Sequence, residues 1–270
     1  MTPGTTSAVA LDSGIHYKGN AGIASWEGRH VDDAERFSRF VRETVRPRIT
    51  DEELSFDDDL RGLASTGMEM EFIEKLLKAA PPPEDWKIGE AFAECALQYD
   101  SGREVHWPWN SIRDQRTPRA SLPGADLVGF YKEGETVLLL VGEVKTSSDT
   151  RTPPNVMTGR SGMTWQLEEN ATRPDIHLQL LQWLLPRCKS SLLFRELYKK
   201  AVQRYLSSDG KELILIGVLI RDTLPNEKDV KNRAKALATK LAAPMRIEIL
   251  AWYLPVSIRE WPRILNEEEP

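Results

Sequence analysis

Three ionisable side chains stand at the ends of a strongly apolar part of the sequence. Asp126 follows the turn-forming pair Pro123-Gly124, and Glu143 and Lys145 close the apolar run 137–144. Because side chains alternate between the two faces of a strand, Glu143 and Lys145 are predicted to share one face. Both faces of the run are apolar, which is typical of a strand covered on two sides. Carboxylates at the end of such a strand are costly unless they are paired or bind a ligand.

The position of Asp126 relative to the other two residues depends on a predicted hairpin. A turn over residues 132–135 is expected to join two strands, 125–131 and 136–145. A loop with an even number of residues places Asp126 opposite Val141 and on the face of Glu143 and Lys145. An odd number would turn Asp126 to the other face unless a bulge intervened. With an even loop, the three side chains are predicted to meet.

The donor types of this cluster indicate a hard metal ion. Asp126 and Glu143 offer only oxygen ligands, which suit Mg²⁺ together with water and phosphate oxygens, and Mn²⁺ is expected to substitute for it. Such a metal lowers the pKa of a bound water, and the Lys145 ammonium could orient that water or offset developing charge. This combination predicts phosphodiester cleavage. A surface ion pair also explains Glu-x-Lys, and a turn explains Asp126 alone, so both interpretations stay open.

The bulk composition restricts the classes of function. The chain has 270 residues and a net charge of -5, with a pI near 5.6, which is unusual for a protein that holds nucleic acid by itself. We therefore expect a DNA-gripping partner to supply part of the affinity. The sequence has no GxxxxGK[ST] motif, so no bound nucleotide cofactor is expected, and it has no GxSxG motif of a serine hydrolase.

Two further features concern compartment and cysteine chemistry. The apolar runs 137–141 and 213–220 are far too short to cross a bilayer, and residues 1–20 lack the pattern of a signal peptide. A cytoplasmic protein without membrane contact is therefore expected. Cys95 and Cys188 occur in apolar, helix-like contexts without metal-ligand spacing, so both are predicted to be core thiols.

Hydrophobic periodicity and turn signals give the order of elements. Helices are predicted over the residues 30–45, 69–80, 85–98 (capped by Asp85), 175–185, 187–206 and 228–242. Strands are predicted over 104–109, 125–131, 136–145, 212–220 and 246–254. The segment 146–173 is interpreted as a long loop because of its Pro, Gly and Ser content.

This order predicts an α/β fold with a mixed central sheet flanked by helices. The triple proline Pro81–Pro83 is the best candidate boundary. It divides the chain into residues 1–83, a partly helical region that could contact a partner, and residues 84–270, which hold the predicted chemistry.

With these elements in place, the sequence resembles the PD-(D/E)XK nuclease superfamily. The match consists of Pro123-Gly124-Ala125-Asp126 followed by Glu143-Val144-Lys145, with Ala125 instead of Pro directly before the aspartate. The resemblance covers about residues 85–254 and implies an αβββαβ core. It also implies that Asp126 and Glu143 are metal ligands, that Lys145 is the catalytic lysine, and that cleavage leaves a 5′-phosphate.

The same resemblance adds residues around this motif. Members often place an acid on the helix before the first core strand, which here implies Glu90 as catalytic acid and metal ligand, or Glu94 one turn later. A solvated outer face explains these two glutamates equally well. Gly89 favours Glu90 because it allows close approach of the backbone. Gln179 resembles the glutamine that some exonuclease-like branches carry on a later helix, although a polar seam on a buried helix also explains it.

Three arginines before the hairpin, Arg113, Arg116 and Arg119, are candidate DNA contacts, although simple solubility also explains them. The segments IGEAFAE, PGADLVG, GEVKTSS and ILAWYLPV are similar to the HamA family, the nuclease subunits of the Hachiman antiphage defence system. That family implies a DNA-cleaving subunit with a helicase partner. Two alternatives stay open: a catalytically idle assembly or sensor module with the same fold, and a repair or transposition endonuclease of the superfamily.

Overall fold

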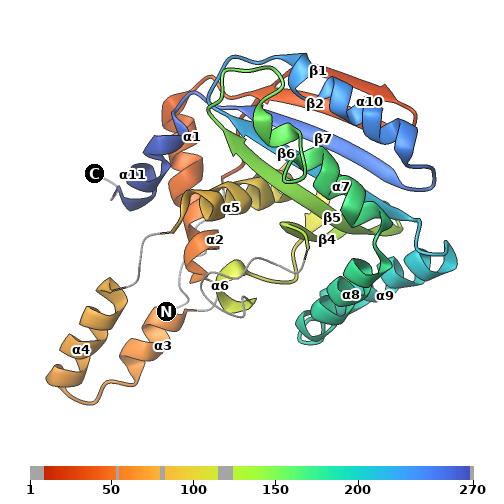
Figure 1. The fold of residues 1–270 in the computed structure, drawn as a ribbon. Coiled ribbons are helices and arrows are strands. Elements are labelled where there is room, and N and C mark those ends of the chain that lie inside the picture. The colour runs from red at the N-terminus through yellow and green to blue at the C-terminus, as the bar shows by residue number, and fades with distance from the viewer. Residues whose placement is uncertain (1–8, 53–54, 80–82, 115–123, 268–270) are drawn as a thin grey trace.

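A seven-stranded mixed β-sheet runs through the centre of the molecule (Figure 1). The structure is a computed structural model that describes residues 9–52, 55–79, 83–114 and 124–267. The strands lie in the order β1-β2-β7-β6-β5-β4-β3. Their bounds are Gly14–Ala21 (β1), Ala24–His30 (β2), Glu104–His106 (β3), Leu127–Glu133 (β4), Thr136–Ser147 (β5), Leu213–Arg221 (β6) and Arg246–Tyr253 (β7).

The strand directions explain why helices cover both faces of the sheet. Strands β5, β6, β7 and β2 run parallel, whereas β4 is antiparallel to β5 and to β3, and β1 is antiparallel to β2. Parallel neighbours require a crossover connection, which here is helical between β5 and β6 and between β6 and β7. The predicted α/β architecture, a mixed central sheet flanked by helices, is confirmed.

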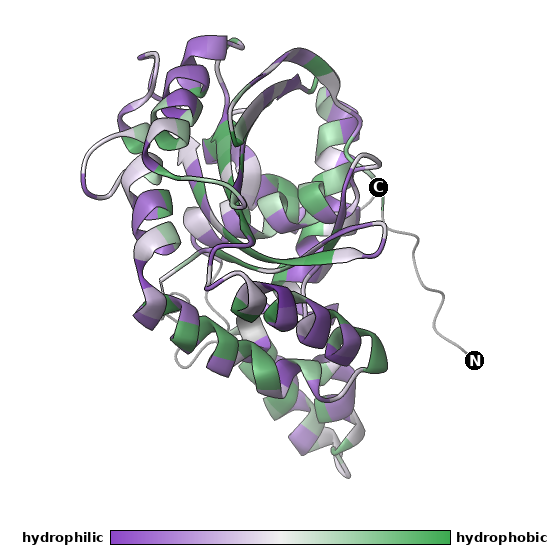
Figure 2. Ribbon diagram, turned by 90° about the vertical axis from the view of Figure 1, so that its right-hand side faces the viewer, coloured by the Kyte–Doolittle hydropathy of each residue, from purple (hydrophilic) through white to green (hydrophobic). Residues whose placement is uncertain are grey.

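Strand β5 contributes alternate residues to two hydrophobic cores, one on each face of the sheet. The residues in the first core are Leu138, Leu140 and Val144, and those in the second are Val137, Leu139 and Val141. Hydrophobic residues accordingly line the central strands (Figure 2). The prediction that this strand is covered on two sides is confirmed, because these side chains are buried on both faces.

The first face of the sheet is covered by α5 (Asp85–Gln98), α11 (Trp261–Asn266) and a continuous helical segment formed by α1 (Ala34–Phe40), the π-helical turn η1 (Val41–Val45) and α2 (Arg46–Thr50). Phe92 of α5 stacks on Trp261 with 6.0 Å between ring centroids. The helix predicted over 30–45 begins only at Ala34, because the Asp33 side chain accepts hydrogen bonds from the first backbone N–H groups and caps it.

The second face is covered by α7 (Met163–Thr172), α8 (Pro174–Cys188), α9 (Leu192–Ser207) and α10 (Lys231–Lys240), with short 3₁₀ turns at Asn155–Met157 (η3) and Glu227–Asp229 (η4). A third such turn, Ile258–Glu260 (η5), precedes α11. The prediction of a long loop over 146–173 is wrong where α7 lies. Met163, Leu167 and Ala171 recur at helical spacing and are buried in the second core, which stabilises the helix.

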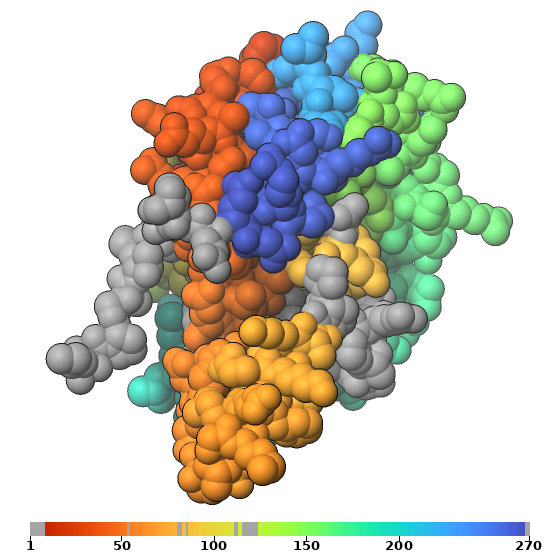
Figure 3. Space-filling model, turned by 90° about the vertical axis from the view of Figure 1, so that its left-hand side faces the viewer, coloured from red at the N-terminus to blue at the C-terminus, as the bar shows by residue number. Residues whose placement is uncertain are grey.

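Helices α3 (Phe56–Gly62) and α4 (Gly67–Lys78) form an arm that extends away from the sheet (Figures 1 and 3). Thr66 and Glu69 form a capping box that fixes the start of α4. Arg61 donates to Glu74 at 2.8 Å and links the two helices. The short helix α6 (Ser111–Asp114) lies between β3 and β4 in the sequence.

The N-terminal part of the chain shares the sheet and core of the rest. Strand β2 pairs with β7, and Phe37 and Phe40 pack in the same core as α5. Pro81 and Pro82 of the predicted boundary lie outside the described residues, which resume at Pro83. Cys95 and Cys188 are buried and unbridged, as predicted. Within the described ranges, no helix has the length and apolar character needed to cross a membrane.

Candidate active site

The register of the β4–β5 hairpin brings Asp126 beside Glu143. Glu133 pairs with Thr136, so only two residues close the turn, and Leu127 pairs with Gly142. The Asp126 N–H then donates to the Gly142 carbonyl at 3.0 Å. The expected pairing of Asp126 with Val141 is therefore wrong by two residues, because the turn is two residues long instead of four. Both loops are even, so the predicted sharing of one face is unchanged.

Hydrogen bonds hold the three side chains in place. The Asp126 Oδ2 atom accepts from the Val144 N–H at 2.9 Å, and Lys145 Nζ donates to Glu143 Oε1 at 2.6 Å. The Glu143 side chain is 3% exposed and the Lys145 side chain 20% exposed. The cluster is therefore at the rim of the core, where the ammonium group stays within reach of solvent.

Helix α5 approaches this end of β5 closely enough to add Glu90 to the cluster. A Cβ atom at Gly89 would lie 2.6 Å from Thr146 Cγ2, so a larger residue would force the Thr146 side chain or the helix to shift. Glu90 follows in the sequence and is half-buried. The helix begins at Asp85 as predicted, but Glu84 occupies the N-cap position that was expected for Asp85.

Burial and mutual repulsion perturb the carboxyl groups. Burial raises the pKa of Glu90 to about 9, and the negative charges of Asp126, Glu94 and Glu143 add to this effect. Burial, followed by the charge of Asp126, also raises the pKa of Glu143, although Lys145 opposes the shift. Two carboxyl groups that resist ionisation therefore lie in one cluster, because each is buried beside other negative charges.

The donor set can be compared directly with the needs of a metal ion. Within the described part of the chain, no group of three His, Cys, Asp or Glu side chains is already arranged to hold a metal. Asp126 and Glu143 nevertheless provide two adjacent carboxylates, and Mg²⁺ commonly uses one or two carboxylates with several waters. The oxygen-only donors fit Mg²⁺ or Mn²⁺ and do not suit a zinc site.

Glu94 has a different environment from Glu90. Its side chain is buried, and Arg48 Nε donates to Glu94 Oε2 at 2.5 Å. Arg48 also donates to the Trp109 carbonyl at 2.6 Å. The interpretation of α5 as a solvated outer face is therefore wrong for Glu94, which joins a buried ion pair. Glu90 lies closer to the chemistry than Glu94, because the charges of both Asp126 and Glu143 act on it.

The structure places Gln179 on the exposed surface of α8. The first helix after β5 is α7, which the sequence interpretation missed. Met163 of α7 packs against Gly217, the residue paired with Glu143 on β6. On the same helix, Gln166 has a buried Oε1 atom without a hydrogen-bond partner among the described residues. The helical spacing of the apolar residues in 163–171 was the signal that could have found it.

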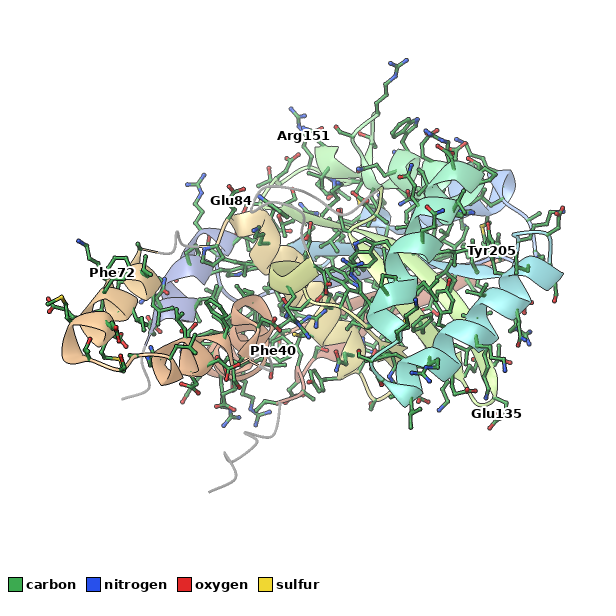
Figure 4. The ribbon with its side chains drawn as sticks, turned by 90° about the horizontal axis from the view of Figure 1, so that it is seen from below. Phe40, Phe72, Glu84, Glu135, Arg151 and Tyr205 are labelled. Atoms are coloured by element: carbon green, nitrogen blue, oxygen red, sulfur yellow. The ribbon has the colours of Figure 1, made fainter. Side chains whose placement is uncertain are left out.

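The segment after Lys145 is anchored from the neighbouring strand. Arg221, at the end of β6, is 1% exposed and pairs with the fully buried Asp229 at 2.5 Å. Arg221 also donates to the carbonyl of Asp149 and, at 3.2 Å, to that of Arg151. Arg151 and Glu84 lie on the same side of the molecule, after β5 and before α5 (Figure 4). The chain that follows the cluster is thus held by hydrogen bonds from the buried Arg221.

Only one of the three candidate DNA-contacting arginines can be placed. Arg113 is exposed and forms an ion pair with the buried Asp51 at 2.7 Å. Arg116 and Arg119 lie outside the described residues, as does Pro123 of the motif. Gly124 has a φ of +88°, a left-handed conformation that favours glycine directly before the cluster.

No protein-family model and no curated protein matches this chain. Function is therefore inferred from the geometry of the site.

Proposed function

We propose that the protein is a Mg²⁺-dependent deoxyribonuclease. The observation that carries the proposal is the meeting of Asp126, Glu143 and Lys145 at the end of a strand buried on both faces. A buried Glu143 carboxylate beside a second carboxylate is costly as a purely structural device, because the buried charge loses hydration. The order α5, β3, β4, β5, helices α7 to α9 and then β6 is compatible with the αβββαβ order expected for the PD-(D/E)XK nuclease superfamily, with the short helix α6 inserted between β3 and β4.

Each residue has a distinct task in this proposal. Asp126 and Glu143 would hold the metal, with Glu90 as a further ligand or as a base for its water. A bound Mg²⁺ would supply electrostatic stabilisation of the phosphate and a more acidic water. The Lys145 ammonium binds the scissile phosphate and offsets negative charge as it develops. The Val144 N–H fixes the Asp126 carboxylate in its orientation.

A separate partner is part of the proposal. The net charge of -5 opposes binding to a polyanion, so we expect the isolated chain to bind DNA weakly. The similarity to the HamA family suggests a helicase or other ATPase that presents DNA to the site, as in an antiphage defence complex. Arg113 could still contribute a phosphate contact from α6.

The experiment is a DNA cleavage assay with the chain alone and with a partner co-purified from its native operon, each with and without ATP. Mg²⁺ or Mn²⁺ is expected to support cleavage, and Ca²⁺ to support it poorly, because its larger and more flexible coordination misplaces the attacking water. Full activity in excess EDTA would refute the metal-dependent mechanism. Equal rates with and without the partner at physiological salt would refute partner dependence alone.

A further inference from the structure

The arm formed by residues 55–79 carries an uncovered apolar surface. Among the described residues of α3 and α4, only Ile73 is buried. The large hydrophobic side chains that remain exposed on the arm are Phe56, Leu63, Met68, Met70, Phe72 and Leu76. Exposed apolar residues that gather on one element indicate a contact surface. Phe72 lies out on the arm, away from the sheet (Figure 4).

The arm is also acidic. It contains the acids Asp57, Asp58, Asp59, Glu69, Glu71 and Glu74 and the bases Arg61, Lys75 and Lys78. Arg61 is already paired with Glu74 and Asp58. Within the described residues, Asp57, Asp59 and Glu71 form no ion pair, although the charge of Asp57 acts on Arg61. The arm is therefore complementary in charge to a second apolar surface whose border carries Lys and Arg.

Such a surface exists on α8 and α9 of the same chain. The exposed hydrophobic side chains there are Leu178, Leu185, Leu192, Leu193 and Leu206. Residues 174–207 include the bases Arg187, Lys189, Arg195, Lys199, Lys200 and Arg204 and the acids Asp175 and Glu196. Arg187, Lys200 and Arg204 are already paired with acids elsewhere in the chain. The remaining bases, Lys189, Arg195 and Lys199, form no ion pair with any described residue. We call this surface the basic face.

The arm and the basic face lie at opposite ends of the lower side of the molecule in Figure 1, so one chain does not bring its own arm onto its own basic face. A second copy can be related to the first by a twofold axis perpendicular to the plane of Figure 1. A half-turn about an axis below the molecule in that view would place the arm of each copy against the basic face of the other. Such an arrangement is closed, because both contacts are satisfied at once.

We propose that the chain forms a reciprocal dimer in which the arm of each copy docks on the basic face of the other. The complementary charges select this pairing, and the exposed leucines, phenylalanines and methionines provide the apolar contact. Nucleic acid fits these surfaces less well, since the arm repels phosphate and leucine side chains contribute nothing to phosphate binding. The dimer is independent of the proposed nuclease activity.

Charge reversal tests the pairing. The arm-reversed variant carries Asp57→Lys, Asp59→Lys and Glu71→Lys, and the face-reversed variant carries Lys189→Glu, Arg195→Glu and Lys199→Glu. Sedimentation velocity from about 1 to 100 µM should show a dimer for the unaltered chain. Each variant alone should dissociate at least about tenfold more readily, because like charges then meet. An equimolar mixture of the two variants should restore the dimer, since both of its contacts again join opposite charges.

A control separates specific contact from total charge and folding. Asp12→Lys, Asp32→Lys and Glu260→Lys change the net charge as the arm-reversed variant does, at exposed positions elsewhere, and should leave the dimer intact. Phe72→Asp should weaken the dimer while circular dichroism stays unchanged. The proposal is overturned if the unaltered chain is a monomer at every concentration, because the arm would then be left to bind a different protein. So does a mixture of the two variants that remains monomeric.

Discussion

The two ends of the β4–β5 hairpin each have a lysine–glutamate pair, in opposite environments. Lys132 and Glu104 are 2.7 Å apart near the turn, with side chains 33% and 47% exposed. Lys145 and Glu143 are 2.6 Å apart at the other end, with side chains 20% and 3% exposed. Hydrogen bonds from Lys132 and His106 lower the pKa of Glu104, whereas burial raises the pKa of Glu143.

This difference teaches that the residue types alone do not identify a reactive site. The exposed pair is a surface ion pair of small energetic value. The interior pair lies beside a second carboxylate, Asp126. Burial removes hydration from its charges, and only a strong interaction with a partner compensates for that loss. The environment at the end of β5 therefore distinguishes a candidate site from a solvated pair.

The largest expected difference between the two ends is in catalysis. Glu143→Ala and Lys145→Ala should each reduce DNA cleavage by roughly 10³-fold or more, because they remove a ligand and a charge needed in the transition state. Lys132→Ala and Glu104→Ala are the matched controls and should leave the rate within about twofold. Rates and melting temperatures should be measured on the same samples. Equal losses at both ends would show that the interior pair is not catalytic.

A smaller effect is expected for Glu90, which lies beside the interior pair. Glu90→Gln should reduce cleavage roughly 10- to 100-fold and weaken Mn²⁺ binding measured by calorimetry. The matched change Glu94→Gln should instead lower the melting temperature, because it breaks the buried pair with Arg48. If Glu94→Gln impaired metal binding more than Glu90→Gln did, the assignment of the helix acid would be reversed.

The raised pKa of Glu90 also predicts how stability depends on pH. The folded state retains a proton at Glu90 up to about pH 9, whereas the unfolded state releases it near the ordinary value of 4.5. The folded state therefore binds more protons between these values, and the free energy of unfolding should fall as pH rises. Glu90→Gln should reduce that fall by about 1 kcal/mol after allowance for partial exposure.

Denaturant titrations at about pH 6 and about pH 9, with EDTA present, measure this difference. Glu104→Gln is the control from the exposed pair. It should leave the pH dependence of the free energy of unfolding between about pH 6 and about pH 9 unchanged. An identical pH dependence in the unaltered chain and in Glu90→Gln would contradict the electrostatic account of the cluster.

The smallest expected effect concerns Gln166 on α7. Its buried Oε1 atom without a partner among the described residues costs stability. Gln166→Leu should therefore raise the free energy of unfolding by about 1 kcal/mol, and it should lower the cleavage rate if the amide contacts the site. Gln179→Leu, at the exposed position on α8, should change neither quantity. A less stable Gln166→Leu would show that the amide has a structural partner.

Much of this architecture could be predicted from the sequence, because local patterns determine it. The alternation and two-sided apolarity of 137–144 predicted β5, and the even hairpin loop predicted that Asp126 shares a face with Glu143 and Lys145. The length of that loop could not be predicted, since Gly134 at the turn allows the tighter two-residue form with a φ of +57°.

Other features depend on contacts between distant segments. The pairing of Glu94 with Arg48 joins α5 to α2 and leaves no local signal. The same holds for the pairing of β2 with β7, which adds the N-terminal hairpin to the sheet. Helix α7 was missed because Gly159 and Gly162 precede it and gave the segment the composition of a loop, although its apolar spacing was helical.

The most direct test of the central claim is a single-turnover cleavage rate on a short DNA duplex, measured at low ionic strength with protein in excess. These conditions compensate for weak DNA binding by the isolated chain. We predict cleavage with Mg²⁺ by the unaltered chain, and none by Glu143→Gln with an unchanged melting temperature or by the unaltered chain in EDTA. Cleavage at an equal rate by Glu143→Gln, or by the unaltered chain in EDTA, would contradict the proposal of a metal-dependent nuclease at this site.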